Sequence, residues 1–172
     1  LMTSNSKILT AVEPIPVYSV NLLPMTTFIW PSMSNGCFTV NDNNVNCYGI
    51  SDFKELLYKT FTVNKTADYL LELDWTSQTG LTFTAPNDDY WNRFGLYIDT
   101  SLNINYGGGY QGAMSQGIIM QRSNDTSVIT KSQTATVSLA ANTTYYLWLS
   151  YSVLADGRNQ NIDFTKMKLT EV

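Results

Sequence analysis

Residues 134–172 read TATVSLAANTTYYLWLSYSVLADGRNQNIDFTKMKLTEV, and this stretch decides the fold of the chain. Apolar and polar residues alternate along 135–139, along 145–153 and again along 162–172. Neighbouring residues of a β-strand point to opposite faces of its sheet, so a period of two predicts strands with one buried face. Short polar segments at 140–144 and 155–161 join these runs. We therefore predict an antiparallel sheet at the end of a domain.

The rest of the chain shows the same alternation. Along 69–75 it places Tyr69, Leu71, Leu73 and Trp75 on one face and polar residues on the other. In all, about eight to ten short runs of this kind occur, a number typical of a β-sandwich or jelly roll. We predict an all-β fold, an antiparallel β-sandwich of jelly-roll type with negligible helix. Residues 1–16 are expected to form an extended lead-in, and residues 17–172 a single domain.

Two local departures from the strand pattern are predicted. The apolar phase slips between Phe164 and Met167, which indicates a β-bulge near Thr165. Residues 51–57 are the one candidate for a helical turn, because Ser51 is a suitable N-cap.

The composition excludes several classes of function. Histidine is absent, which removes the usual general base and the commonest transition-metal ligand. The formal net charge is −4 and the 10 Lys and Arg residues form no cluster, unlike the surface of a nucleic-acid-binding protein. No apolar segment is long enough for a transmembrane helix. We expect no cofactor, no metal centre, no nucleic-acid partner and no membrane insertion.

Carboxylate pairs are the remaining candidates for catalysis. Glu72 and Asp74 share one face of a predicted strand, and Asp88 and Asp89 are adjacent in a polar segment. Two carboxylates can serve as acid and base in glycoside hydrolysis. Alternating acidic residues are, however, ordinary on a solvated strand face, so we expect a protein that is not an enzyme.

Two segments rich in aromatic and polar residues are predicted to bind a ligand. Aromatic rings can stack on a sugar ring, while neighbouring carboxylates and amides bind its hydroxyl groups. In the second segment, glycines at 107–109 let the backbone approach a ligand between two tyrosines. The alternatives are a calcium site in the first segment and, for both, solvated loops without a ligand. The predicted site comprises Asp88, Asp89, Tyr90, Trp91 and Asn92 of one loop, and Tyr106, Tyr110 and Gln111 of the other.

Cys37 and Cys47 flank a predicted turn. A three-residue loop at 41–43 would place the two cysteines opposite each other across a hairpin, where they can form a disulfide. A four-residue turn would instead place Cys47 opposite Phe38. The register of the hairpin therefore bears on whether these residues are bridged or are two free thiols.

Two tryptophans in predicted strands differ in their surroundings. Trp75 belongs to an apolar row and is predicted to lie in the core. Trp148 faces away from its two leucine neighbours, on the same side as Tyr146 and Ser150. This mixed face is predicted to line a groove or a subunit interface.

The order of the strand segments resembles that of compact jelly rolls. The segments are FTV at 61–63, YLLEL at 69–73, VSL at 137–139, NTTYYL at 142–147 and IDF at 162–164. From residue 58 onward the chain resembles the head domains of bacteriophage receptor-binding proteins and, more distantly, C1q/TNF-like trimers. The resemblance implies a homotrimer on an extracellular or virion surface that binds a cell-surface glycan or receptor. It carries over no binding residue, because it rests on strand patterning without an invariant signature.

Missing histidine, scattered charge and aromatic loops favour binding over chemistry. We expect a non-enzymatic recognition domain, the receptor-binding head of a viral or phage fibre or spike. One alternative is a carbohydrate-binding module of an extracellular glycoside-active enzyme, or such an enzyme itself. A second alternative is a structural capsid or decoration protein.

Overall fold

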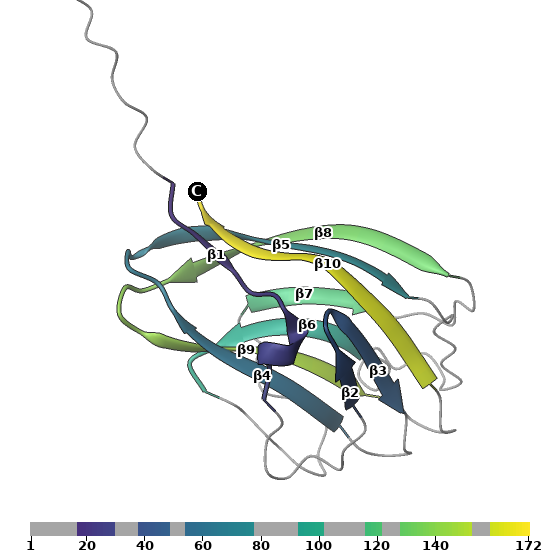
Figure 1. The fold of residues 1–172 in the computed structure, drawn as a ribbon. Helices are drawn as coiled ribbons and strands as arrows, with labels where there is room; N and C mark the ends of the chain where they lie inside the picture. The colour runs from purple at the N-terminus through teal and green to yellow at the C-terminus, as the bar shows by residue number, and fades with distance from the viewer. Residues whose placement is uncertain are drawn as a thin grey trace, which may run out of the picture.

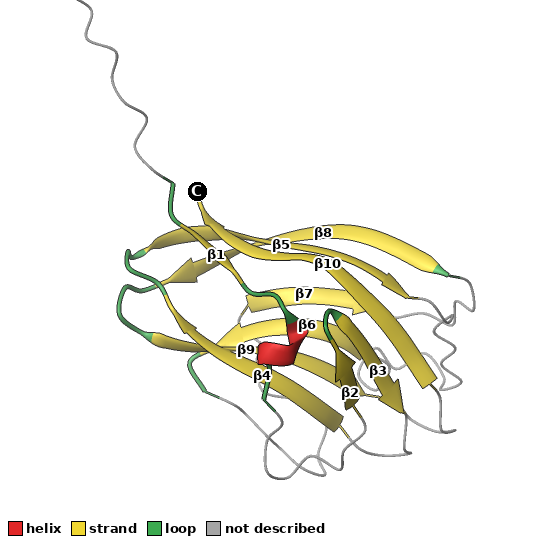
Figure 2. Ribbon diagram, viewed as in Figure 1, coloured by secondary structure: helices red, strands yellow, loops and turns green. Residues whose placement is uncertain are grey.

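Two antiparallel sheets face each other across one apolar core in a computed structural model of the chain (Figure 1). The structure describes residues 17–29, 38–48, 54–77, 93–101, 116–121, 128–152 and 159–172. Strands make up almost all regular structure in these ranges, and the short 3-10 helix η1, Met25–Thr27, is the exception (Figure 2). The predicted antiparallel β-sandwich is confirmed. The lead-in at residues 1–16 lies outside the described residues and stays a prediction.

The first sheet has the strand order β2-β3-β10-β5-β8, and β1 pairs with β10 beside this path. Its strands are β1 (Ser19–Asn21), β2 (Phe38–Asn41), β3 (Asn44–Tyr48), β5 (Ala67–Ser77), β8 (Ile129–Leu139) and β10 (Asn159–Glu171). The second sheet has the order β4-β9-β6-β7. Its strands are β4 (Lys54–Thr62), β6 (Arg93–Asp99), β7 (Gln116–Gln121) and β9 (Thr144–Ser152). From β3 onward the chain changes sheets at almost every connection, as jelly-roll topologies do.

The apolar rows predicted from the sequence form the core. Tyr69, Leu71 and Leu73 are fully buried, and Trp75 is 1% exposed. The indole nitrogen of Trp75 donates a hydrogen bond to Oε1 of Gln133 at 2.8 Å, so its polar atom is satisfied inside the sandwich.

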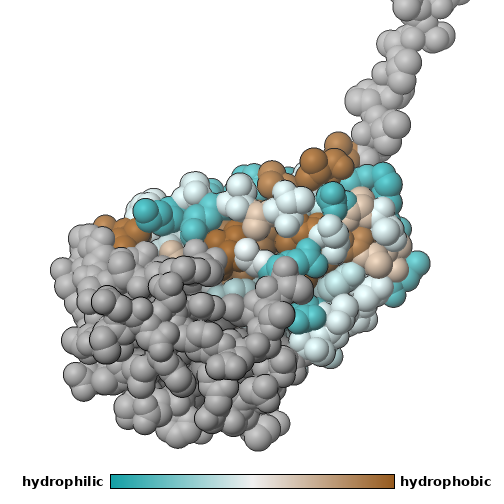
Figure 3. All heavy atoms as spheres, turned by 180° about the vertical axis from the view of Figure 1, so that it is seen from behind, coloured by the Kyte–Doolittle hydropathy of each residue, from teal (hydrophilic) through white to brown (hydrophobic). Residues whose placement is uncertain are grey.

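Seen from behind, apolar residues are visible between polar ones in the described part of the surface (Figure 3). No helix among the described residues is long and apolar enough to span a membrane.

Of the two predicted departures from regular strands, one is confirmed and one is wrong. The register of β10 against β5 shifts between Phe164 and Lys166, which is the predicted bulge at Thr165. Within residues 51–57, the described part is not helical, because β4 begins at Lys54 and its Leu57 is fully buried opposite Leu149. Pairing of β4 with β9 along its whole length outweighs a local capping signal that could support only a very short helix.

The hairpin of β2 and β3 adopts the register that places Cys47 opposite Phe38. Its turn spans four residues, with Asp42 and Asn43 between the paired Asn41 and Asn44. The three-residue loop that would have set the two cysteines directly opposite each other is not formed. Cys37 lies outside the described residues, so the disulfide with Cys47 stays a prediction.

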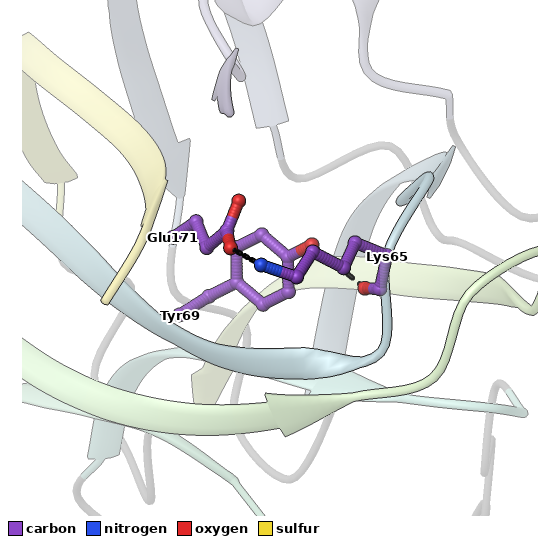
Figure 4. A network of polar contacts seen from close by, with 3 residues as sticks. All are labelled: Lys65, Tyr69 and Glu171. Carbon is purple, nitrogen blue, oxygen red and sulfur yellow. Dashed lines mark hydrogen bonds and ion pairs between the residues drawn. The ribbon is translucent and has the colours of Figure 1, made fainter. Parts of the chain in front are cut away.

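Side chains join the strands at one end of the sandwich. Lys65 in the turn before β5 donates a hydrogen bond to Glu171 near the end of β10 (Figure 4). The Tyr69 hydroxyl donates to the carbonyl oxygen of Lys65 at 2.8 Å. The contact with Glu171 raises the pKa of Lys65, and the contact with Lys65 lowers the pKa of Glu171.

The edge strands β7 and β8 of the two sheets are linked by hydrogen bonds of one side chain. Oε1 of Gln116 accepts a hydrogen bond from the N–H of Ser138 at 2.5 Å, and its Nε2 donates to the carbonyl oxygen of Ser138 at 3.3 Å. A side-chain amide thus reproduces the donor and acceptor pairing of a neighbouring strand. This contact links the two sheets where their backbones are not hydrogen-bonded to each other.

Candidate functional site: a groove beside the β10 bulge

The ligand-binding residues predicted from the sequence lie outside the described residues. This holds for both predicted loops, and the structure therefore neither brings them together nor separates them. The loop site stays a prediction. Its residues are Asp88, Asp89, Tyr90, Trp91, Asn92, Tyr106, Tyr110 and Gln111.

An open groove of about 590 Å³ lies where the segment after β1, the β2–β3 turn and the middle of β10 meet. Figure 1 shows β1, η1, the β2–β3 hairpin and β10 on the same side of the molecule. The volume is within the range of about 300–1,000 Å³ that is typical of small-ligand sites. The lining residues are Asn21, Leu23, Pro24, Asn43, Thr165, Lys166, Met167 and Lys168.

The bulge in β10 builds one wall of this groove. An extra residue interrupts the alternation of the strand, so that Thr165 is exposed and the next residue, Lys166, is half-buried. Phe164 and Met167 on either side are buried in the core. Two neighbouring polar side chains therefore point away from the core at one place. Bulges commonly re-aim side chains next to functional sites.

The β2–β3 turn forms a second wall through Asn43. Asp42 before it has a φ of +53°, a left-handed conformation that Asp and Asn tolerate better than most residues. Oδ1 of Asn43 accepts a hydrogen bond from the N–H of Met25 at 3.3 Å, and its carbonyl oxygen accepts one from Phe164 at 3.0 Å. These bonds fix the turn against η1 and β10. They leave the Asn43 amide nitrogen as a donor for a ligand.

The segment after β1 forms the third wall. Asn21 lies opposite Lys168 in the pairing of β1 with β10, and its Oδ1 accepts a hydrogen bond from Leu23 N–H at 3.2 Å. Leu22 N–H donates to the carbonyl oxygen of Met167 at 2.9 Å. From the second sheet, Lys59 Nζ donates to the carbonyl oxygen of Leu22 at 3.1 Å. Burial lowers the pKa of Lys59. Both sheets thus hold this segment in place.

The groove lining is rich in hydrogen-bond donors. Its described residues supply the amide nitrogens of Asn21 and Asn43 and the ammonium groups of Lys166 and Lys168, and none of these residues carries a carboxylate. Lys166 Nζ also donates to Oε1 of Glu72 at 2.5 Å, which raises the pKa of Lys166. Such a lining complements a ligand that carries many oxygen acceptors.

The carboxylate pair considered for catalysis is not part of this groove. Glu72 and Asp74 lie on the outer face of β5, and Glu72 forms an ion pair with Lys166. Neither carboxylate lines the groove. Among the described residues, no group of three or more Cys, Asp or Glu side chains could hold a metal ion.

The prediction that Trp148 lines a groove or a subunit interface is wrong. Trp148 is only 1% exposed, and its ring packs on that of Tyr97 with centroids 5.3 Å apart. Tyr97 itself is 4% exposed. Trp148 therefore offers no surface to a groove or to another subunit, although Tyr146 on the same face is half-buried.

No protein-family model matches the sequence, and no curated protein matches it. Among solved structures, the chain is similar to the native structure of a family 35 carbohydrate-binding module from Clostridium thermocellum. The two share 11% sequence identity with a TM-score of 0.30, over 90% of this chain and 95% of that chain. A likeness at this level bears on no residue of the groove.

Proposed function

We propose that this chain is a non-catalytic domain that binds carbohydrate in the groove beside the β10 bulge. The observation that carries the proposal is the composition of the groove. Amide, hydroxyl and ammonium groups surround Leu23, Pro24 and Met167 within one cavity. A sugar presents hydroxyl groups at its rim and C–H groups on its ring faces, so it can use polar and apolar contacts together. Ligand sites of this size usually combine apolar walls with a few placed polar groups.

The same lining argues for binding rather than catalysis. General acid–base catalysis needs a group whose pKa lies near the working pH. The groove residues that the structure describes include no carboxylate, and the chain contains no histidine. The pKa of Lys166 is raised by its hydrogen bond to Glu72, which is the opposite of what a lysine base requires.

Among the biological settings considered, a module of an extracellular glycoside-active enzyme is favoured over the head of a phage fibre or spike. A trimeric head was expected to use the face of Tyr146 and Trp148. Trp148 is already buried within one chain, where it packs on Tyr97. The chain then acts as a monomer that holds a partner domain near polysaccharide, and an extracellular location is part of this proposal.

A glycan array followed by calorimetric titration of the best ligand tests the proposal. We expect millimolar or tighter single-site affinity, about −4 kcal/mol or more favourable. Lys168→Ala and Asn21→Ala each remove one donor. Binding should weaken about tenfold for Lys168→Ala and less for Asn21→Ala, since a hydrogen bond from a charged donor contributes about 1.5 kcal/mol or more and one from a neutral amide about 1 kcal/mol. Lys131→Ala is the matched control, because Lys131 is exposed on β8 and is not part of the groove lining.

Two results would contradict the proposal in different ways. An array on which no glycan is retained would remove carbohydrate binding altogether. Groove variants that bind a retained glycan like the parent would move the site elsewhere. If Trp91→Ala and Tyr110→Ala then weaken binding, the loop site predicted from the sequence is the correct one.

A further inference from the structure

A row of paired residues crosses the outer face of the second sheet. Strand pairing connects Ile29 to Tyr58, Tyr58 to Trp148, Trp148 to Tyr97, and Tyr97 to Gly117. Directly opposite residues of antiparallel strands point to the same face. Most residues that flank the row in its strands belong to the core cluster, so the row faces away from the core; these are Leu57, Leu96, Ile98, Ile118, Leu147 and Leu149.

Burial changes along this row. Tyr97 and Trp148 are 4% and 1% exposed, whereas Tyr58 is half-buried and Ile29 is 51% exposed. The Tyr97 ring lies along its own strand over Gly95, because a Cβ built on Gly95 would be 2.1 Å from the Tyr97 hydroxyl oxygen. The side chains of this row are therefore buried at β6 and β9 and become exposed to solvent toward β4 and Ile29.

At the open end, two tyrosines form a pair with accessible rings. The ring centroids of Tyr58 and Tyr146 are 5.8 Å apart and the ring planes are inclined at 50°. Thr60 is exposed on β4 directly opposite Tyr146. Ile29, Tyr58, Thr60 and Tyr146 together make up what we call the tyrosine platform.

We propose that the tyrosine platform is a second carbohydrate-contact surface, on which the sugar rings of a neutral polysaccharide stack. The inference rests on the proposed function and adds a site that shares no residue with the groove. Aromatic rings with polar edges suit ligands that are apolar on one side and wet on the other. The hydroxyl groups of Thr60 and of the exposed Thr62 and Thr144 beside it can bind the sugar hydroxyls.

The charge beside the platform disfavours an acidic occupant. Asp99 lies directly opposite Tyr146 in the pairing of β6 with β9, so a carboxylate next to the tyrosine pair repels an anionic chain. Lys54 of β4 and Arg93 of β6 are both paired with Ser152, at the other end of β9 from Tyr146. The face also exposes little large apolar surface beyond Ile29, whereas subunit interfaces need a sizeable apolar centre. A neutral polysaccharide therefore fits better than an acidic one or a second copy of the chain.

The test is a depletion assay with insoluble cellulose, mannan and xylan, and with polygalacturonic acid as an acidic comparison. We expect at least one neutral polysaccharide to deplete the parent protein from solution. Tyr58→Ala and Tyr146→Ala should each weaken that binding about tenfold, while Tyr58→Phe keeps the ring and the binding. Tyr18→Ala is the matched control, because Tyr18 is a half-buried tyrosine paired with Tyr69 on the first sheet. Thermal unfolding of each variant verifies that it is folded.

The groove variant Lys168→Ala separates the second site from the first. Binding that is lost in Lys168→Ala but unchanged in Tyr58→Ala and Tyr146→Ala would overturn the platform and leave the proposed function intact. A parent protein that none of the neutral polysaccharides depletes would also overturn it, and so would preference for polygalacturonic acid through the tyrosines. Light scattering provides one more outcome. A dimer that Tyr58→Ala dissociates would make the platform a subunit interface instead.

Discussion

Gly117 of β7 lies so close to the backbone of β6 that a side chain does not fit there. Its substitution tests how tightly β7 packs against β6. A Cβ at this position would lie 2.3 Å from the carbonyl oxygen of Leu96 and 2.9 Å from Cα of Tyr97. Both are backbone atoms of the neighbouring strand β6, so no side-chain rotation relieves the contact. The φ of Gly117 is +156°, which side-chain-bearing residues rarely adopt. We therefore expect Gly117→Ala to separate β7 from β6.

The expected magnitude follows from these two effects. Overpacking costs about 1–3 kcal/mol, and an unfavourable backbone conformation costs about 1–3 kcal/mol more, so Gly117→Ala should lower the free energy of unfolding by about 2–6 kcal/mol. Gly95→Ala serves as comparison. Its Cβ would contact only the outer atoms of the Tyr97 ring, which can turn away at the cost of its packing on Trp148. A loss of about 1–3 kcal/mol is expected there.

Urea denaturation followed by circular dichroism measures both losses. The expected order is parent, then Gly95→Ala, then Gly117→Ala, from most to least stable. A Gly117→Ala variant within about 0.5 kcal/mol of the parent, the usual range for a neutral surface change, would refute the tight packing of β7 against β6.

Further predictions concern the side-chain contacts between strands and the oligomeric state of the chain. Gln116→Ala should lower the free energy of unfolding by about 1–2 kcal/mol, since it removes both hydrogen bonds to Ser138; an unchanged urea midpoint would count against this link between the sheets. The pKa of Glu171 is lowered from 4.5 by Lys65, so its contribution to stability is present above pH 4.5 and is lost as the pH falls through the lowered value. The pKa of Lys65 is raised from 10.5, so its contribution to stability is present below pH 10.5 and is lost as the pH rises through the raised value. Glu171→Gln should flatten both limbs of a plot of unfolding temperature against pH, and identical plots would show that the pair contributes nothing. Because Trp148 is buried within one chain, light scattering should give a monomer of 19.3 kDa, and a trimer would restore the fibre-head interpretation.

The fold could be predicted from the sequence because its determinants are local. The row from Tyr69 to Trp75 has a period of two, and the structure buries all four apolar residues. The bulge near Thr165 could also be predicted, since a slip of phase is visible along a single strand. The helical turn predicted at residues 51–57 is wrong for the described residues 54–57, because a local capping signal says nothing of the β9 partner that pairs with β4. The hairpin register depended on one residue of turn length, which composition alone does not specify.

The candidate site could be predicted only in part. The bulge marked its position, but the partners of the bulge come from residues more than a hundred positions earlier in the chain, such as Asn21 and Asn43. Nothing local about these asparagines separates them from the other asparagines of a chain rich in turns. The burial of Trp148 was missed for a similar reason. Trp148 packs on Tyr97, and the Tyr97 ring lies over Gly95, where a side chain would displace it.

The central claim is that a sugar binds in the groove beside the β10 bulge, and a heteronuclear NMR titration tests it most directly. A ¹⁵N-labelled protein is titrated with the best ligand from the glycan array, and the positions of the backbone and side-chain amide signals are followed. The account predicts shifts at the side-chain amides of Asn21 and Asn43 and at the backbone amides of residues 165–168. Signals at these positions that stay fixed while the amides of residues 87–92 and 106–111 shift would contradict it.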